Sequence, residues 1–66
     1  MKIIFTNHAK QRMVERGIRL NEIKETINFP DYTITKENKT EAYRNNLKIV
    51  YISKDKFIRI VTVIRK

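Results

Sequence analysis

Apolar and polar residues alternate along most of the second half of the chain, a pattern typical of β-strands. The alternation predicts strands over residues 32–35, 41–44, 47–53 and 57–65. Asn45-Asn46 and Lys54-Asp55-Lys56 separate the last three runs and suit hairpin turns, because Asn tolerates the positive φ of a two-residue loop. The polar residues 36–40 are expected to form a turn. The second half is therefore predicted to be an antiparallel meander.

The first half begins with a short apolar run and continues with helical spacing. Residues 3–5, Ile-Ile-Phe, are expected to form a brief strand. Thr6 or Asn7 then suits the N-cap of a helix of about ten residues. This helix is expected to end at Gly17, the only glycine, in the left-handed conformation that a Cβ would disfavour.

A second helix of about nine residues is predicted to start near Leu20 or Asn21 and to stop before Pro30, with Ile23 and Ile27 in one apolar stripe. The order of elements predicts an α+β fold, in which a short N-terminal strand is followed by two helices packed on one face of a three- to four-stranded antiparallel sheet. A chain of 66 residues is too short for two cores, so residues 1–66 are expected to form a single domain.

The alternation also assigns the side chains of residues 57–65 to the two faces of the sheet. One set is expected to face the helices and the core: Ile58, Ile60, Thr62 and Ile64. The other set is expected on the opposite face: Phe57, Arg59, Val61, Val63 and Arg65. Valines framed by arginines are unusual on a plain solvated face, so this face has room for a ligand or a partner chain.

Charge and cysteine content narrow the class of partner and the compartment. Fifteen Lys and Arg against seven Asp and Glu give a net charge of +8, which favours a polyanion such as RNA, although high charge also serves solubility. The absence of cysteine excludes disulfides and thiol chemistry and agrees with a reducing compartment. Because no apolar run approaches the length of a membrane span, we expect a cytoplasmic protein without membrane association.

The first predicted helix carries candidate chemistry on one face. At about 100° per residue, His8, Gln11, Arg12 and Glu15 gather on that face, with Arg16 at its edge. A neutral imidazole can take a proton from a ribose 2′-hydroxyl or give one to a leaving oxygen, and the arginines can hold a phosphate. The alternative is that the histidine caps the backbone and that the charged residues form surface pairs.

Residues of the predicted strands can extend this surface toward single-stranded nucleic acid: Tyr43, Arg44, Tyr51, Arg59 and Arg65. Tyr43 and Tyr51 suit ordinary packing across the sheet at least as well. One histidine and scattered carboxylates do not predict a metal site, and the single glycine excludes phosphate-loop and dinucleotide motifs. No cofactor is therefore expected.

Three segments carry a resemblance to a known group of proteins: His8-Ala9-Lys10-Gln11-Arg12-Met13-Val14-Glu15-Arg16-Gly17-Ile18, Glu22-Ile23 and Ile60-Val61-Thr62-Val63-Ile64-Arg65. The chain resembles a family of small prokaryotic domains of unknown function. That family is similar to reduced members of the RelE/ParE-type toxins, within the barnase, EndoU, colicin and RelE fold. The resemblance implies metal-independent RNA cleavage by attack of the 2′-hydroxyl, and an antitoxin partner.

The same resemblance implies roles for five residues. His8 would be the acid or base, Arg12 and Arg16 would bind phosphate, and Thr62 and Arg65 would lie near the scissile phosphate. The rival expectation is a non-catalytic interaction module or a homodimer, whose exposed sheet face pairs with an acidic partner or with a second copy of the chain.

Overall fold

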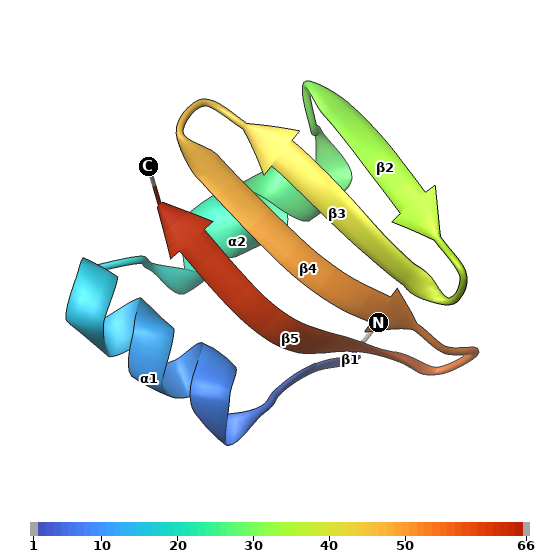
Figure 1. The fold of residues 1–66 in the computed structure, drawn as a ribbon. Coiled ribbons are helices and arrows are strands. Elements are labelled where there is room, and N and C mark those ends of the chain that lie inside the picture. The colour runs from blue at the N-terminus through green and yellow to red at the C-terminus, as the bar shows by residue number, and fades with distance from the viewer. Residues whose placement is uncertain (1, 66) are drawn as a thin grey trace.

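The computed structural model describes residues 2–65, in which five strands form one mixed sheet and two helices lie against it (Figure 1). The elements are β1 (Lys2–Phe5), α1 (Asn7–Arg16), α2 (Leu20–Asn28), β2 (Tyr32–Lys36), β3 (Lys39–Arg44), β4 (Leu47–Ser53) and β5 (Phe57–Arg65). The predicted α+β fold, with a short first strand followed by two helices, is confirmed.

The sheet is larger than predicted and is not purely antiparallel. Its strand order is β1-β5-β4-β3-β2, and β1 pairs in parallel with the first half of β5. The other three pairings are antiparallel. The sequence pattern predicted β2 as a strand of the meander, but it carried no information about where β1 pairs, because that pairing depends on how the two helices return the chain.

Local signals fix both ends of α1. The Thr6 hydroxyl accepts a hydrogen bond from the Ala9 N–H at 3.1 Å, which makes Thr6 the N-cap. Gly17 has a φ of 62°, and the Ile18 N–H donates to the Met13 carbonyl at 2.9 Å. The second helix begins at Leu20, where the Arg19 N–H donates to the Glu22 carboxylate at 2.8 Å.

Two of the three loops between the strands of the meander contain only two residues. Asn45 has a φ of 55° in the β3–β4 loop, as expected for an Asn-Asn hairpin. The β2–β3 loop is shorter than the turn predicted over residues 36–40, because β2 extends to Lys36 and β3 begins at Lys39. Glu37 therefore occupies this loop with a φ of 55°, a conformation that is costly for a residue with a Cβ.

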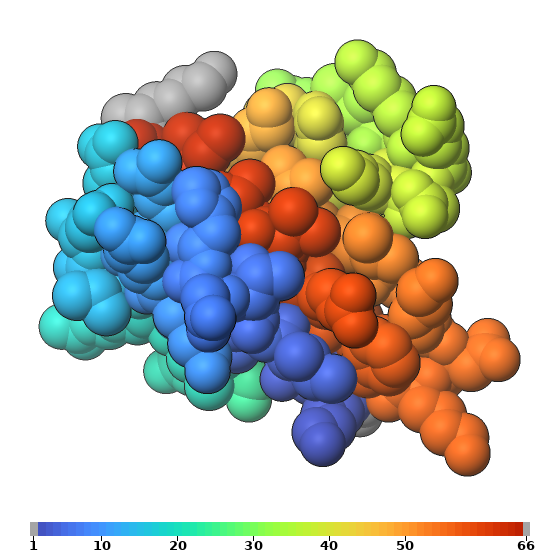
Figure 2. Space-filling view, turned by 60° about the horizontal axis from the view of Figure 1, so that its bottom comes forward, coloured from blue at the N-terminus to red at the C-terminus, as the bar shows by residue number. Residues whose placement is uncertain are grey.

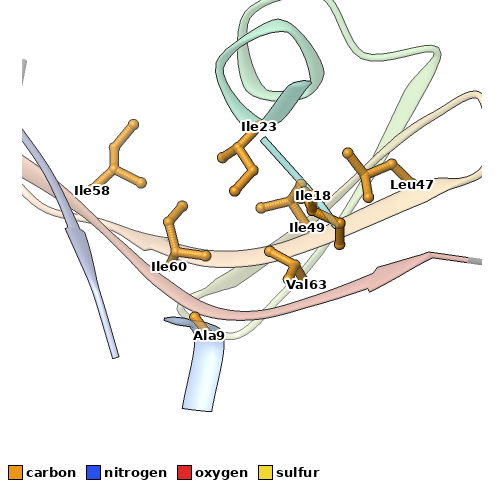
Figure 3. Close-up of a cluster of buried hydrophobic side chains, with 8 residues drawn as sticks. All are labelled: Ala9, Ile18, Ile23, Leu47, Ile49, Ile58, Ile60 and Val63. Atoms are coloured by element: carbon orange, nitrogen blue, oxygen red, sulfur yellow. The ribbon is translucent and has the colours of Figure 1, made fainter. Parts of the chain in front are cut away.

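The core lies between the helices and the sheet, where the buried apolar side chains of the two layers meet (Figure 3). Its members come from α1, the α1–α2 connection, α2, β4 and β5: Ala9, Ile18, Ile23, Leu47, Ile49, Ile58, Ile60 and Val63. Figure 3 shows Ile23 of α2 pointing toward the sheet residues Ile49 and Ile60. With no disulfide, this packing holds the fold together.

The predicted side-chain directions in β5 are correct in the first half of the strand and wrong in the second. Ile58 and Ile60 face the core as expected. Val63, predicted on the opposite face, is fully buried, and Ile64, predicted in the core, is 41% exposed. Arg65, likewise predicted on the opposite face, reaches the helix side.

A β-bulge explains the inversion. Tyr51 pairs with Ile60, whereas the preceding residue Val50 pairs with Thr62, so β5 contains one extra residue, Val61. An extra residue reverses the alternation for everything that follows it. Thr62 therefore lies on the face opposite to the predicted one.

Candidate nucleic-acid interface

One face of the sheet is free of helices in the part of the chain that the structure describes. The second helix contacts β3 and β4, and α1 contacts β5 and β1. In Figure 1, α2 lies behind the sheet, and the face turned to the viewer is uncovered. We call this face the open face. Its residues alternate along their strands with those that face the helices, and they pair with one another across the sheet: Tyr32, Ile34, Glu41, Tyr43, Lys48, Val50, Ile52, Phe57, Arg59, Thr62 and Ile64.

The open face presents aromatic rings next to cations. Tyr32 and Tyr43 stack with their ring centroids 4.5 Å apart and their planes 11° from parallel. The Lys48 ammonium lies 5.7 Å from the centroid of the Tyr43 ring, and the Arg59 guanidinium lies 5.9 Å from that of Phe57. Aromatic planes flanked by positive charge can stack on nucleobases while the cations attract the phosphates.

The Tyr43 side chain is held in place by polar contacts. Its hydroxyl donates to the Glu41 carboxylate at 2.8 Å, and Lys48 lies 3.8 Å from the same carboxylate oxygen. The hydrogen bond to Glu41 raises the pKa of Tyr43 above its ordinary value, with desolvation as the second cause. The phenol therefore stays protonated at neutral pH, and Glu41 is already engaged inside the protein.

The first helix is attached to β5 at the bulge. The Thr6 N–H donates to the Ile60 carbonyl at 3.1 Å, and the Thr6 hydroxyl donates to the Val61 carbonyl at 2.9 Å. The same hydroxyl caps α1, so one side chain joins the helix N-terminus to the irregular point of the strand. Beyond Thr6 the chain leaves β1, and α1 contacts β5 along its length, as Figure 2 shows for the blue helix against the red strand.

The two flanks of α1 lie on different sides of the molecule. Ala9 is fully buried at the centre of the inward side. Lys10 and Val14, on one flank, line a hollow together with Phe5 on the helix-covered side of the sheet. The periodicity of the helix places the other flank toward the open face. That flank carries His8, Arg12 and Arg16.

The three predicted residues of α1 thus share one surface. His8 is exposed in the first turn, Arg12 is half-buried, and Arg16 is exposed in the last turn. Arg12 donates to the Glu15 carboxylate at 3.2 Å, and Gln11 donates to the same carboxylate. The surface pairing considered for Arg12 is therefore present. Because exposed pairs of this kind are weak, Glu15 does not prevent Arg12 from binding an anion.

Thr62 and Arg59, two residues predicted on β5, also lie on the open side. Thr62 is half-buried, and Arg59 is exposed. Thr62 is in the stretch of β5 that follows the bulge, alongside which α1 runs. The structure thus brings the His8, Arg12 and Arg16 flank and two strand residues to neighbouring surfaces.

The remaining three predicted residues lie on the covered face. The Arg65 guanidinium donates to the Glu22 carboxylate at 2.7 Å, and Arg44 donates to the Phe29 carbonyl at 2.6 Å. Tyr51 packs against the core. Arg44 and Arg65 flank Leu47 in one row across three strands, and both line a polar hollow of about 210 Å³ beside α2.

The Glu22 carboxylate receives two hydrogen bonds in this region. These hydrogen bonds lower the pKa of Glu22 below its ordinary value. The bond from the Arg19 backbone N–H has the largest effect on this pKa, and the bond from Arg65 has the next largest. Arg65 is thereby tied to the start of α2, and its role in the folded chain is to join β5 to that helix.

Sequence reasoning missed two residues that shape the open face, Tyr32 and Lys48, whereas it placed Phe57 on this face. Tyr32 was recognised as part of a strand, but its stacking with Tyr43 depends on the β2–β3 register. A signal was present for Lys48, because it alternates with the buried residues Leu47 and Ile49 and must point away from the helices.

Two further findings concern metal sites and membranes. Among residues 2–65, no three His, Asp or Glu side chains lie close enough together to hold a metal ion. Neither of the helices described here has the length and apolar character needed to cross a membrane.

The fold and the open face define a small α+β protein with a basic, aromatic sheet surface bordered by a helix. A family model described as "Domain of unknown function (DUF4258)" matches residues 5–65, so the chain belongs to this family. This agrees with the expected membership in a family of small domains of unknown function. Searches of curated proteins and of solved structures gave no significant match.

Proposed function

We propose that the protein binds single-stranded RNA across the open face and cleaves it without a metal ion, at the flank of α1 that carries His8. The observation that carries the proposal is the presence of two surfaces on the same side of the sheet. The stacked Tyr32 and Tyr43 on β2 and β3, with Lys48 on β4 beside them, offer a platform for bases. At the other edge of the sheet α1 packs on β5, and the helix period places its basic flank toward the same side.

Two properties of the open face and the net charge of the chain favour single-stranded RNA as the substrate. A sheet surface with exposed ring planes suits unpaired bases, which can turn outward and stack, whereas bases in a duplex are already stacked. Tyr32 is 56% exposed, so its ring is accessible on one side. The net charge of +8 supplies long-range attraction for the phosphate backbone.

The proposed reaction is transesterification followed by release of the product strand. The ribose 2′-oxygen forms a bond to the adjacent phosphorus, and the bond to the 5′-oxygen of the next nucleotide breaks. His8 accepts the proton of the 2′-hydroxyl or supplies one to the leaving 5′-oxygen, and solvent provides the other transfer. Arg12 and Arg16 offset the charge that develops on the phosphate, and the Thr62 hydroxyl donates to a phosphate oxygen. The products are a 2′,3′-cyclic phosphate and a 5′-hydroxyl.

The test is incubation of labelled single-stranded RNA with purified protein in EDTA, with the ends of the products identified chemically. Wild type is expected to leave 2′,3′-cyclic phosphate ends. His8→Ala should slow cleavage by about 100-fold or more, and Arg12→Ala should slow it less. Lys54→Ala, in the β4–β5 turn away from α1, is the matched control for loss of one positive charge. Uncut RNA with wild type would reject the enzyme, and binding without cleavage would leave an RNA-binding protein.

A second candidate function is a non-catalytic interaction module that uses the open face. Ile34 and Ile64 are 38% and 41% exposed there, which an interface with a protein would bury. Salt separates the two candidates, because RNA binding weakens steeply as salt rises and an apolar contact barely responds.

The likeness to RelE/ParE toxins stays a prediction with its own test: an acidic protein encoded beside this chain should bind it and block cleavage.

A further inference from the structure

The helix-covered side of the molecule contains a groove that the proposed RNA site does not use. No Cα atom of α1 comes within 8 Å of one of α2, although both helices pack on the same sheet. Two hollows lie between the helices and the sheet, of about 300 and 400 Å³. We call them together the interhelix groove, lined by Ile3, Phe5, Lys10, Met13, Val14, Ile18, Lys24, Ile27, Asn28 and Ile58.

The two hollows share the edge strand β1 as their floor. Ile3 lines one hollow and Phe5 the other, and they stand two residues apart on the same face of β1. Both pack against the core cluster. The groove therefore runs along β1, with α1 as one wall and α2 as the other.

Apolar side chains on both walls remain exposed. Val14 on α1 is 83% exposed, and it lines the groove beside the partly buried Met13. On α2, Ile27 lines the groove and is partly buried, and Leu20, which lies one turn before Lys24 and outside the lining, is 42% exposed. A single exposed apolar residue is ordinary, but two facing walls above an apolar floor form a surface suited to a partner.

The charge of the groove is of one sign. Its charged members are Lys10 on α1 and Lys24 on α2, one on each wall. The acidic residues of the helices point elsewhere: Glu15 pairs with Arg12, and Glu22 pairs with Arg65. Glu25 lines the polar hollow on the far side of α2. An occupant that is apolar along its centre and acidic along both edges would complement this surface.

We propose that the interhelix groove binds an acidic amphipathic helix of a partner protein. Such a helix presents apolar residues at i, i+3, i+4 and i+7 to the groove and places Asp or Glu beside Lys10 and Lys24. The ten residues of α1 span about 15 Å, which matches about three turns of a bound helix. A second copy of the chain is a poorer occupant, because each copy carries a charge of +8.

The probe is a fluorescent helical peptide of about 15 residues with a leucine stripe flanked by glutamates, compared by anisotropy with two controls. One control replaces each glutamate by lysine, and the other scrambles the stripe. The acidic peptide should bind at least about tenfold more tightly than either control. Val14→Gln, which changes no charge, should weaken binding by about tenfold, through loss of buried apolar surface.

Charge reversal tests the walls of the groove. A double variant that combines Lys10→Glu with Lys24→Glu should bind the lysine peptide more tightly than the glutamate peptide. The control combines Lys54→Glu with Lys56→Glu, which makes the same charge change in the β4–β5 turn. This control should still prefer the glutamate peptide. RNA affinity is measured in parallel and should be unchanged by Val14→Gln. Loss of peptide binding with RNA binding retained, or the reverse, then separates this proposal from the proposed function.

Several results would overturn the inference. Equal binding of the scrambled peptide, or equal effects of the two double variants, would show attraction by net charge alone. Backbone chemical shifts that change on the open face instead of around Val14 would move the site. A dimer in sedimentation that Val14→Gln dissociates would make a second copy the occupant.

Discussion

The two faces of the sheet carry similar basic side chains in different states. On the covered face, Arg44 and Arg65 are bound to the Phe29 carbonyl and the Glu22 carboxylate, so their charge serves the fold. On the open face, Arg59 is exposed and lies over the Phe57 ring, and Lys48 lies over the Tyr43 ring and pairs with the Glu41 carboxylate. The comparison shows that what a basic residue on a strand can contact is known only once its face is known.

The covered face should control stability, and its largest effect is expected at Ile49. This side chain is fully buried, so Ile49→Ala should lower the free energy of unfolding by about 2–5 kcal/mol, measured by urea denaturation. Ile49→Val should cost about 0.5–1.5 kcal/mol and leave RNA affinity unchanged. A loss of RNA affinity in the folded valine variant would show that the two faces are coupled.

The open face should control affinity, with Tyr43 as the test residue. Tyr43→Ala removes the stacking partner of Tyr32 and should weaken single-stranded RNA binding by about tenfold or more. Tyr43→Phe keeps the ring, loses the hydrogen bond to Glu41, and should retain most of the affinity. Fluorescence anisotropy measures both variants, and unchanged affinity of the alanine variant would remove the aromatic platform from the proposal.

The Glu22 cluster on the covered face should make stability depend on pH at the acidic side. Because the folded-state pKa of Glu22 is lowered from 4.5, its contribution is present above pH 4.5 and is lost as the pH falls through the folded value. Glu22→Gln should reduce this part of the acid sensitivity, measured as urea midpoints between pH 7 and pH 3. Glu15→Gln, which removes an exposed pair on α1, is the control and should leave the acid slope nearly as in wild type.

The smallest expected effect is at the β2–β3 loop, which lies outside both the covered face and the proposed platform for RNA bases. Glu37 has a φ of 55°, which Asn adopts at lower cost, so Glu37→Asn should raise the free energy of unfolding by about 0.5–1 kcal/mol. Thermal denaturation measures the gain. A loss of stability would mean that Glu37 contributes contacts that outweigh its backbone cost.

Features encoded by neighbouring residues could be predicted from the sequence. Thr6 and Gly17 mark the ends of α1, and Asn45 marks a hairpin, because each depends on the backbone within a few residues. The grouping of His8, Arg12 and Arg16 on one flank likewise follows from the period of a single helix.

Features that depend on distant pairing could not be predicted. Whether β1 lies beside β5 is decided by the path of two helices, and the bulge at Val61 is visible only in the β4–β5 register. The placement of Arg65 on the face opposite to the helices depended on unbroken alternation, and the bulge puts this residue on the covered face. Arg44 lies on that face because it is two residues from the buried Ala42.

The bulge at Val61 decides which side chains in the second half of β5 face outward. If the bulge were lost and Val61 retained in regular pairing, Val63 and Arg65 would replace Thr62 and Ile64 on the open face. The Thr6 hydroxyl, bonded to the Val61 carbonyl, secures the present arrangement. Deletion of Val61 would instead close the bulge and keep Thr62 and Ile64 outward, so this one residue can be lost without changing what the second half of β5 offers to a ligand.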